Sequence, residues 1–323
     1  MASPSPTPPA PISNPKSKIS NPRAWISFCV LCLAWGSTYV GIRMGAQELP
    51  PALFSGTRFL TAGIVFGVAC VLTGRALPAT GRDVGDAAVA GVLLIAGGNG
   101  LLTWASRYVT AGVAALVLGA VPLMTASIDA IVPGGKPIRP LGWAGLVAGF
   151  GGIVLLIGPD LAARAAGSSV PLALLGLLLA GILWSAGMVY GKRRPPRGSL
   201  LGTAAVQTAS GGAVLCVIGL LSGELPQFTP TPQGWWVILY LFLVGGIVGF
   251  LAYNVLLDAW PAARASTYCY VNPVVAVVLG RLVLGESIAP RQVAAGAIIL
   301  AGVAVVNWAS AEGRPSGSPG DAR

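Results

Sequence analysis

The sequence contains no histidine and very little charge, and each absence excludes a class of function or fold. Without histidine, imidazole metal sites, histidine general bases and histidine pH switches are impossible. Charged residues make up 9% of the 323 residues, whereas a soluble globular chain carries about 25%. A soluble domain of this length could not cover its surface with polar groups.

Apolar residues and glycine are what the sequence has in excess. Hydrophobic residues make up 54% of the chain, which excludes general disorder, and the 45 glycines show no G-X-Y period, which excludes collagen. The net charge of +10 is dispersed over short loops and forms no basic face, so we expect no nucleic-acid partner. The composition predicts an all-α polytopic membrane protein.

Ten apolar runs follow one another along the chain, each near the ~20 residues that cross a bilayer. They are too long for strands and lack period-two alternation. We therefore predict ten transmembrane helices. Their ranges are 25–45, 53–73, 87–106, 111–132, 141–158, 170–191, 199–221, 234–257, 265–284 and 290–310.

Lys and Arg predict the orientation. If the N-terminus is cytoplasmic, fourteen of the 20 basic residues lie on the cytoplasmic side and four lie outside, so both termini should be cytoplasmic. Residues 1–23, with seven prolines, and residues 311–323 are expected to be disordered tails. The first tail lacks the pattern of a cleaved signal, so the first apolar run should be retained as a helix.

The second half of the sequence repeats the first. Residues 25–158 and 170–310 each hold five predicted helices, and an odd number makes the second copy enter the membrane from the opposite side. Inverted repeats are typical of secondary transporters with a site at the midplane, although a duplication in another kind of membrane protein is the alternative. Matched positions are Ala111 with Ala262, Pro122 with Pro273, Gly134 with Gly285, Gly145 with Gly296 and Gly151 with Gly302 at an offset of about 151, and Trp35 with Trp184 and Arg43 with Lys192 at 149.

Polar and aromatic residues within the runs are candidates for a substrate cavity. Amide and hydroxyl groups can bond ammonium and carboxylate groups, while Trp and Tyr offer flat apolar walls with one polar handle. Such a cavity suits a small amphipathic solute such as an amino acid, but the same groups also serve to join helices. The candidates are Trp35, Thr38, Asn99, Thr103, Trp104, Trp184, Tyr253, Asn254, Tyr268, Tyr270 and Asn272.

Prolines and glycines within the runs predict helix shape. Pro122 and Pro273 should kink their helices, either beside the transport path or as simple packing. Glycines four residues apart should stack on one helix face and allow close helix contacts. These pairs are Gly41/Gly45, Gly63/Gly67, Gly145/Gly149, Gly187/Gly191 and Gly245/Gly249.

Few groups in the sequence could couple transport to energy or perform catalysis. Asp129 is the only acid clearly within a predicted span, and its position near Lys136 favours an ion pair at the helix end over a proton relay. No Walker or hydrolase motif occurs, and Cys29 and Cys32 have no second pair to complete a metal site. We expect no enzyme activity, no metal and no cofactor.

Four stretches carry a resemblance to a known family: WGSTYVGIR, LPPALFSGTRFLTAG, GNGLLTWASRYVTAGVAALVLGAVPL and STYCYVNPVVAVVLGRLVLGES. The first three resemble the opening repeat of the EamA family of the drug/metabolite transporter superfamily, and the fourth resembles its second repeat. The resemblance covers residues 25–310 and is greatest to bacterial amino-acid and metabolite exporters. It implies a ten-helix inner-membrane exporter with a central cavity, and a structural role for Arg58 at the outer end of the second helix.

The sequence thus predicts an exporter of amino acids or similar small amphipathic metabolites in the bacterial inner membrane. It should work by alternating access without ATP, with a small-molecule substrate and the lipid bilayer as partners and a single chain as the working unit. A multidrug or toxic-compound exporter of the same fold is the alternative. An intramembrane enzyme or a purely structural protein fits the sequence less well, since no catalytic set lies at depth and the inverted repeat favours transport.

Overall fold

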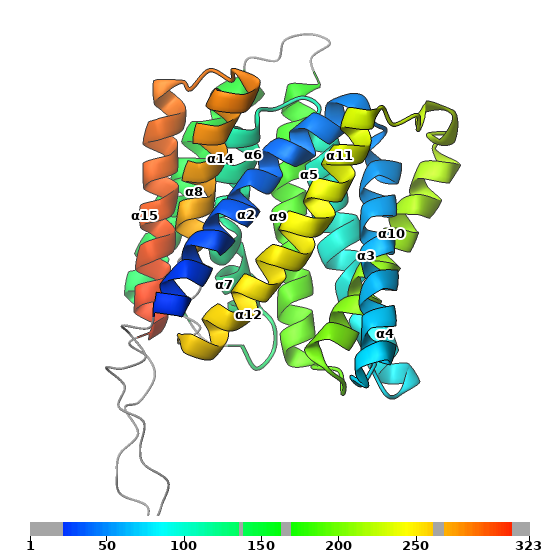
Figure 1. The fold of residues 1–323 in the computed structure, drawn as a ribbon. Coiled ribbons are helices and arrows are strands. Elements are labelled where there is room, and N and C mark those ends of the chain that lie inside the picture. Colours follow the sequence, from blue (N-terminus) through cyan, green and yellow to red (C-terminus); the bar gives the residue numbers. More distant parts are fainter. Residues whose placement is uncertain (1–21, 136–137, 163–168, 261–267, 312–323) are drawn as a thin grey trace, which may run out of the picture.

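The computed structural model of the chain describes residues 22–135, 138–162, 169–260 and 268–311. Within these ranges the chain forms helices, turns and loops, with no strand. Side chains at 157–162, 254, 257, 258, 307, 310 and 311 lie outside the described part, as do nearly all of the two predicted tails. Figure 1 shows the helices packed side by side in one bundle. In chain order the elements are α2 (Pro22–Glu48), α3 (Pro51–Thr73), α4 (Gly81–Gly91), η1 (Val92–Asn99), α5 (Gly100–Ala105), α6 (Ala111–Gly119), α7 (Val121–Ile131), α8 (Pro140–Ala162), α9 (Val170–Arg193), α10 (Leu200–Leu221), η2 (Leu225–Gln227), α11 (Pro232–Tyr240), η3 (Leu241–Val248), α12 (Gly249–Ala259), α14 (Tyr268–Leu284) and α15 (Pro290–Ala311).

The apolar runs expected from the sequence lie on these helices. Within the described residues, seven helical stretches are long and apolar enough to cross a membrane: Pro22–Glu48, Pro51–Thr73, Gly81–Ala105, Ala111–Ile131, Val170–Arg193, Leu200–Leu221 and Pro232–Tyr253. Three further apolar helices are shorter: Pro140–Leu156, Tyr268–Leu284 and Pro290–Val306. The chain is therefore an all-helical protein with several membrane-spanning helices.

Polar punctuation between the runs sets the helix ends. The side chains of Thr110, Ser199 and Thr231 each accept a backbone N–H in the first turn of α6, α10 and α11, which satisfies a donor that the helix itself leaves free. Gly74 ends α3 with a φ of 64°, a left-handed conformation that glycine adopts without strain.

Three of the expected single helices are interrupted. The run 87–106 is an α-helix, a π-helix (η1) and a second α-helix, and the run 234–257 has the same order around η3. The run 111–132 is divided at Ala120, with φ −85° and ψ 1°, into α6 and α7. The break at Ala120 lies two residues before Pro122, where the sequence predicted a kink. Hydropathy reports how apolar a segment is but not its hydrogen-bond register, so the sequence alone did not predict the two π-helices.

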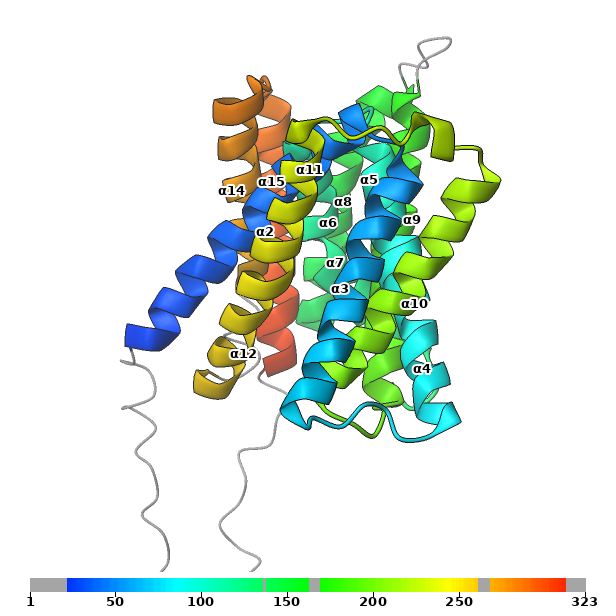
Figure 2. The ribbon, with the colours of Figure 1, turned by 45° about the vertical axis from the view of Figure 1, so that its right-hand side comes forward.

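The first helix of each half of the chain packs against the other half. Helix α2 lies against η3, α12 and α14, while α9 lies against η1, α5 and α7. The second helices, α3 and α10, pack against each other, as Figure 2 also shows, and so do the last ones, α8 and α15. Helices α2 and α9 run in opposite directions through the bundle (Figure 1). Each half therefore needs the other half to cover its own first helix.

Glycine allows the closest of these contacts. A Cβ added at Gly63 of α3 would lie 2.5 Å from the backbone nitrogen of Ala209 on α10, and one added at Gly302 would lie 2.6 Å from the carbonyl oxygen of Gly145. The four-residue spacing predicted a close helix contact at Gly67 as well, but a Cβ there would meet nothing within 4 Å. The other spaced glycines each have a neighbour within that distance.

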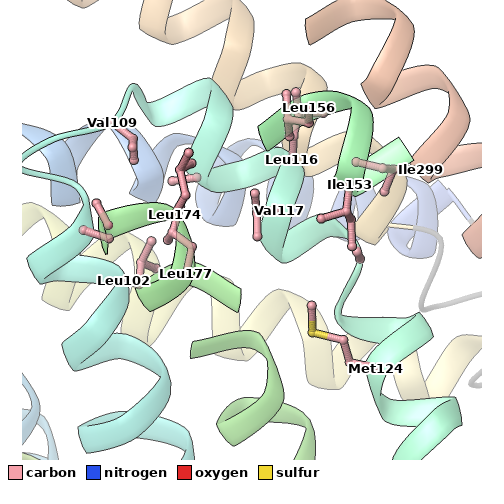
Figure 3. Packing of buried hydrophobic residues seen from close by; sticks show 14 of the residues in the cluster. Leu102, Val109, Leu116, Val117, Met124, Ile153, Leu156, Leu174, Leu177 and Ile299 are labelled. Atoms are coloured by element: carbon pink, nitrogen blue, oxygen red, sulfur yellow. The ribbon is translucent and has the colours of Figure 1, made fainter. Parts of the chain in front are cut away.

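The apolar side chains lie either in the interior of the bundle or on its outward faces. A buried cluster that includes Leu102, Val117, Leu177 and Ile299 joins α5, α6, α9 and α15 (Figure 3). The outward faces carry many exposed large apolar side chains, among them Leu282, which is 75% exposed. A soluble monomer rarely exposes apolar surface on this scale, so these faces are suited to lipid.

Candidate functional site

Three predicted cavity residues form an aromatic cluster between the halves. Trp35 of α2 lies with its ring centroid 5.5 Å from that of Tyr253 on α12 and 5.0 Å from that of Tyr268 on α14. The two tyrosine rings meet edge to face at 6.0 Å. All three side chains are half-buried, so the cluster presents apolar ring surface at a contact between elements of both halves.

The indole of Trp35 is held by the π-helix η3. Its Nε1 donates a hydrogen bond to the carbonyl oxygen of Gly245 at 3.0 Å, and a Cβ at Gly249 would lie 2.2 Å from the same nitrogen. Thr38 Oγ1 donates to the carbonyl oxygen of Trp35 at 2.6 Å, while its methyl group lies beside Gly245. Gly249, the first residue of α12, thus leaves the space that this ring occupies.

A matching arrangement occurs in the other half. Trp184, which the 149-residue offset pairs with Trp35, lies over Gly98 of η1, where a Cβ would come 2.7 Å from its Cε3. The same offset maps Val92–Asn99 onto Leu241–Val248, so the two π-helices are also equivalent. π-helical turns are frequent at functional sites. The repeat therefore extends to an irregular feature of the backbone.

Two polar pairs join α3 to η1 and α5. Arg58 Nη2 donates to Oδ1 of Asn99 at 3.2 Å, and the two side chains are 5% and 8% exposed. The hydroxyls of Ser55 and Thr103 lie 2.7 Å apart and are fully buried. The hydrogen bond of Thr103 thus joins α5 to α3. Sequence reasoning missed Ser55 and the pairing of Arg58.

The remaining candidates are spread over the bundle. Trp104 lies beside Gly176 of α9 and edge to face with Tyr108. Asn272 is 8% exposed, and its Oδ1 is buried without a hydrogen-bond partner. Tyr270 packs against the main apolar cluster. Asn254 falls on α12, and its side chain lies outside the described residues.

The two prolines differ in their effect on the backbone. Pro122 is the second residue of α7, two residues after the break at Ala120. Pro273 lies inside α14, which continues through it, and its Cγ would be 3.0 Å from a Cβ at Gly119. Pro273 therefore packs against the end of α6, beside the break that precedes Pro122.

Ion pairs stand at opposite ends of the bundle. Arg43, near the C-terminal end of α2, pairs with Glu286 at 3.2 Å, and Arg193, at the end of α9, pairs with Asp129 at 3.0 Å. The expected helix-end ion pair of Asp129 is thus present with Arg193, while Lys136 lies outside the described residues. The sequence analysis missed Glu286, because it is 243 positions from its partner in the numbering of the chain.

Metal ligands do not gather in the part of the chain that the structure describes. No group of three or more His, Cys, Asp or Glu side chains occurs there. The five cysteines are free thiols, with Cys29 exposed and Cys32 buried.

Each half of the chain matches the same protein family. The EamA-like transporter family matches this chain twice, over residues 23–158 and 171–308. The chain is similar to a protein of Escherichia coli strain K12 named "Uncharacterized inner membrane transporter YedA", with 37% identity over 279 residues that cover 85% of this chain and 88% of that protein.

More distant similarities span most of the chain as well. A protein of Streptantibioticus cattleyicolor named "Probable terminal-alkyne amino-acid exporter" is 24% identical over 276 residues, which cover 85% of this chain and 90% of the relative. A protein of known crystal structure matches with a TM-score of 0.60 and 21% identity, over 88% of this chain and 96% of its own. At that identity the solved structure supports the fold alone.

Proposed function

The chain belongs to the EamA-like transporter family and is a multi-pass inner-membrane protein, and on this basis we propose that it exports amino acids or similar small amphipathic metabolites. The relative named as a probable amino-acid exporter supports this substrate class. The Trp35, Tyr253 and Tyr268 rings add flat apolar surface of the kind that such solutes contact.

One observation carries the mechanism: each half places its own tryptophan, Trp35 or Trp184, on the π-helix of the other half. We infer that residues 25–158 and 170–310 act as inverted five-helix repeats, with ten spans and both termini cytoplasmic. Rocking of one repeat against the other would expose the site to each side in turn. The Arg43–Glu286 and Arg193–Asp129 pairs would open alternately, because they join the repeats at opposite ends.

We also propose an energy source and an oligomeric state. The chain would act as a monomer, as a facilitator or exchanger, without ATP, a cofactor or enzymatic activity.

Counterflow into liposomes tests the function. Purified full-length chain is reconstituted into liposomes loaded with one unlabelled amino acid, and the uptake of its labelled form is followed for a panel of amino acids. We expect exchange of at least one amino acid without ATP or an ion gradient. A parallel series uses labelled lipophilic drugs in place of the amino acids. Exchange of no amino acid would refute the proposal, and exchange of drugs only would favour the multidrug alternative.

Two tryptophan-to-alanine variants test whether the aromatic cluster lies on the transport path. Trp35→Ala removes the ring that joins the aromatic cluster to η3, so exchange should fall at least about tenfold. Trp236→Ala is the matched control, because that ring is 69% exposed on the outer surface of α11. Equal loss in both variants would exclude the aromatic cluster as part of the path.

A further inference from the structure

Arg58 is a buried cation with most of its hydrogen-bonding capacity unused. It lies on the membrane-spanning helix α3 with 5% of its surface exposed. Its Nη2 donates to Asn99 Oδ1 at 3.2 Å, while its Nε is buried without a partner. A guanidinium has five N–H donors, so a single hydrogen bond leaves the group largely unsatisfied within the protein.

No acidic residue in the described part of the chain forms an ion pair with Arg58; the described ion pairs lie near the ends of the helices. The rings of Phe54 and Phe59 lie 5.8 and 4.3 Å from its guanidinium carbon. Such cation–π contacts compensate only part of the cost of burying a charge. In a membrane interior an uncompensated guanidinium is costly. A bound group with one negative charge would compensate the charge of Arg58.

The neighbouring polar pair shows which group is left unsatisfied. Ser55 lies three residues before Arg58 on α3, and Thr103 lies four residues after Asn99. The two pairs therefore form successive links, about one helical turn apart, between α3 and the continuous helical stretch Gly81–Ala105. One of the hydroxyls of Ser55 and Thr103 donates to the other at 2.7 Å, so each has a partner. The charged group among these four side chains belongs to Arg58, and its Nε has no partner.

We propose that Arg58 binds the carboxylate of the transported solute, an assignment that rests on the proposed function and names the group that recognises the substrate. A carboxylate matches the planar fork of a guanidinium and forms charge-assisted hydrogen bonds with it. Neither a neutral solute nor a lipophilic cation supplies the missing charge. Arg58 therefore selects solutes that carry a carboxylate, and Asn99 orients its side chain. A small inorganic anion is the competing source of the same charge.

The transport test compares each exchanged amino acid with its own carboxamide. The carboxamide keeps the amine and the side chain but lacks the negative charge. In counterflow by the full chain, we expect the carboxamide to compete at least about tenfold more weakly than the acid. Arg58→Lys should keep a reduced preference for the acid, and Arg58→Gln should lose it.

The outcomes of this comparison separate two failures. Equal competition by acid and carboxamide in the wild-type chain overturns the role of Arg58 and leaves the proposed function intact. Exchange of no amino acid overturns the proposed function itself. Thermal protection of the wild-type chain by inorganic phosphate or chloride, without any preference for acid over carboxamide, assigns the position to an inorganic anion and also overturns the proposal.

A charge-compensated variant tests Arg58 without removing it. Asn99→Asp places a carboxylate where Asn99 now accepts the hydrogen bond from Arg58. We expect a higher midpoint of thermal unfolding in detergent than that of the wild-type chain, together with loss of the preference for acid, because the internal carboxylate takes the place of the solute. A lower midpoint overturns the proposal.

Gln207→Glu is the matched control for an added acid. Gln207 lies on α10 at the position that the 149-residue offset pairs with Arg58, and it is half-buried. This variant should keep the preference for acid over carboxamide. Loss of the preference here as well would show a general repulsion of anions and would overturn the assignment to Arg58.

Discussion

Arg43 Nε lies 3.2 Å from Glu286 Oε1, and this ion pair joins the first helix of one half to the turn after α14 in the other. The same carboxylate oxygen accepts the backbone N–H of Ala111 at 2.9 Å, while Arg43 also donates to the carbonyl oxygen of Ser106 at 2.5 Å. The two side chains are 16% and 10% exposed. One ion pair therefore ties α2, the α5–α6 turn and the end of α14 together.

Glu286→Gln tests the strength of this tie. Because the variant leaves Arg43 partly buried without its counter-ion, we expect a loss of about 3 kcal/mol in the free energy of unfolding, measured by denaturant titration in mixed micelles. A double-mutant cycle with Arg43→Gln isolates the pair. Arg82→Gln is the control, since its pair with Asp86 is 3.9 Å long and Arg82 is 82% exposed, and its loss should stay below about 1 kcal/mol. Equal effects at both pairs would contradict the prediction.

Trp35→Phe separates the indole hydrogen bond from ring packing. The variant keeps an aromatic ring but leaves the Gly245 carbonyl without its donor, so stability should fall by about 1 to 2 kcal/mol. Trp184→Phe is the repeat-matched control, because Trp184 packs over Gly98 through its ring carbon Cε3. The same unfolding measurement compares the two. A smaller loss for Trp35→Phe than for Trp184→Phe would exclude an important role for the bond to Gly245.

Gly63→Ala and Gly67→Ala test the close approach of α3 and α10. The methyl group at 63 would collide with the backbone of Ala209, so we expect a loss of about 1 to 3 kcal/mol. The methyl group at 67 meets open space, and the higher helix propensity of alanine should leave stability unchanged or raise it by up to about 1 kcal/mol. Thermal unfolding of the purified variants measures both, and equal destabilisation would be inconsistent with the packing at Gly63.

Asp129→Asn tests whether an acid within an apolar helical stretch couples transport to protons. The pair of Asp129 with Arg193 indicates a role at the helix end, so we expect no uptake driven by a proton gradient alone in either the wild-type chain or the variant. Arg193 retains its hydrogen bond to the carbonyl oxygen of Pro133, which should preserve the fold. Gradient-driven uptake by the wild-type chain that disappears in Asp129→Asn would overturn the prediction.

The sequence predicted the local features of the site better than its contacts. Trp35, Tyr253 and Tyr268 were all candidates for one cavity, and the structure brings them together. Asn99 and Thr103 were candidates on the same grounds, yet they bond Arg58 and Ser55 on α3. An amide or hydroxyl in an apolar run signals only that a partner is needed. Which group supplies it depends on helix rotation, and one sequence does not report that.

By itself, the sequence determined the fold class, the membrane setting and the internal repeat, because hydropathy, run length and offset are properties of residues along the chain. Only the tertiary structure showed that η1 and η3 are π-helices and that the first helix of each half packs against the other half. It also decided the isolation of Arg58 from any described acid. In an apolar solvent, helices associate through shape, small residues and polar pairs and not through hydrophobicity. Those contacts exist only once the helices have been assembled.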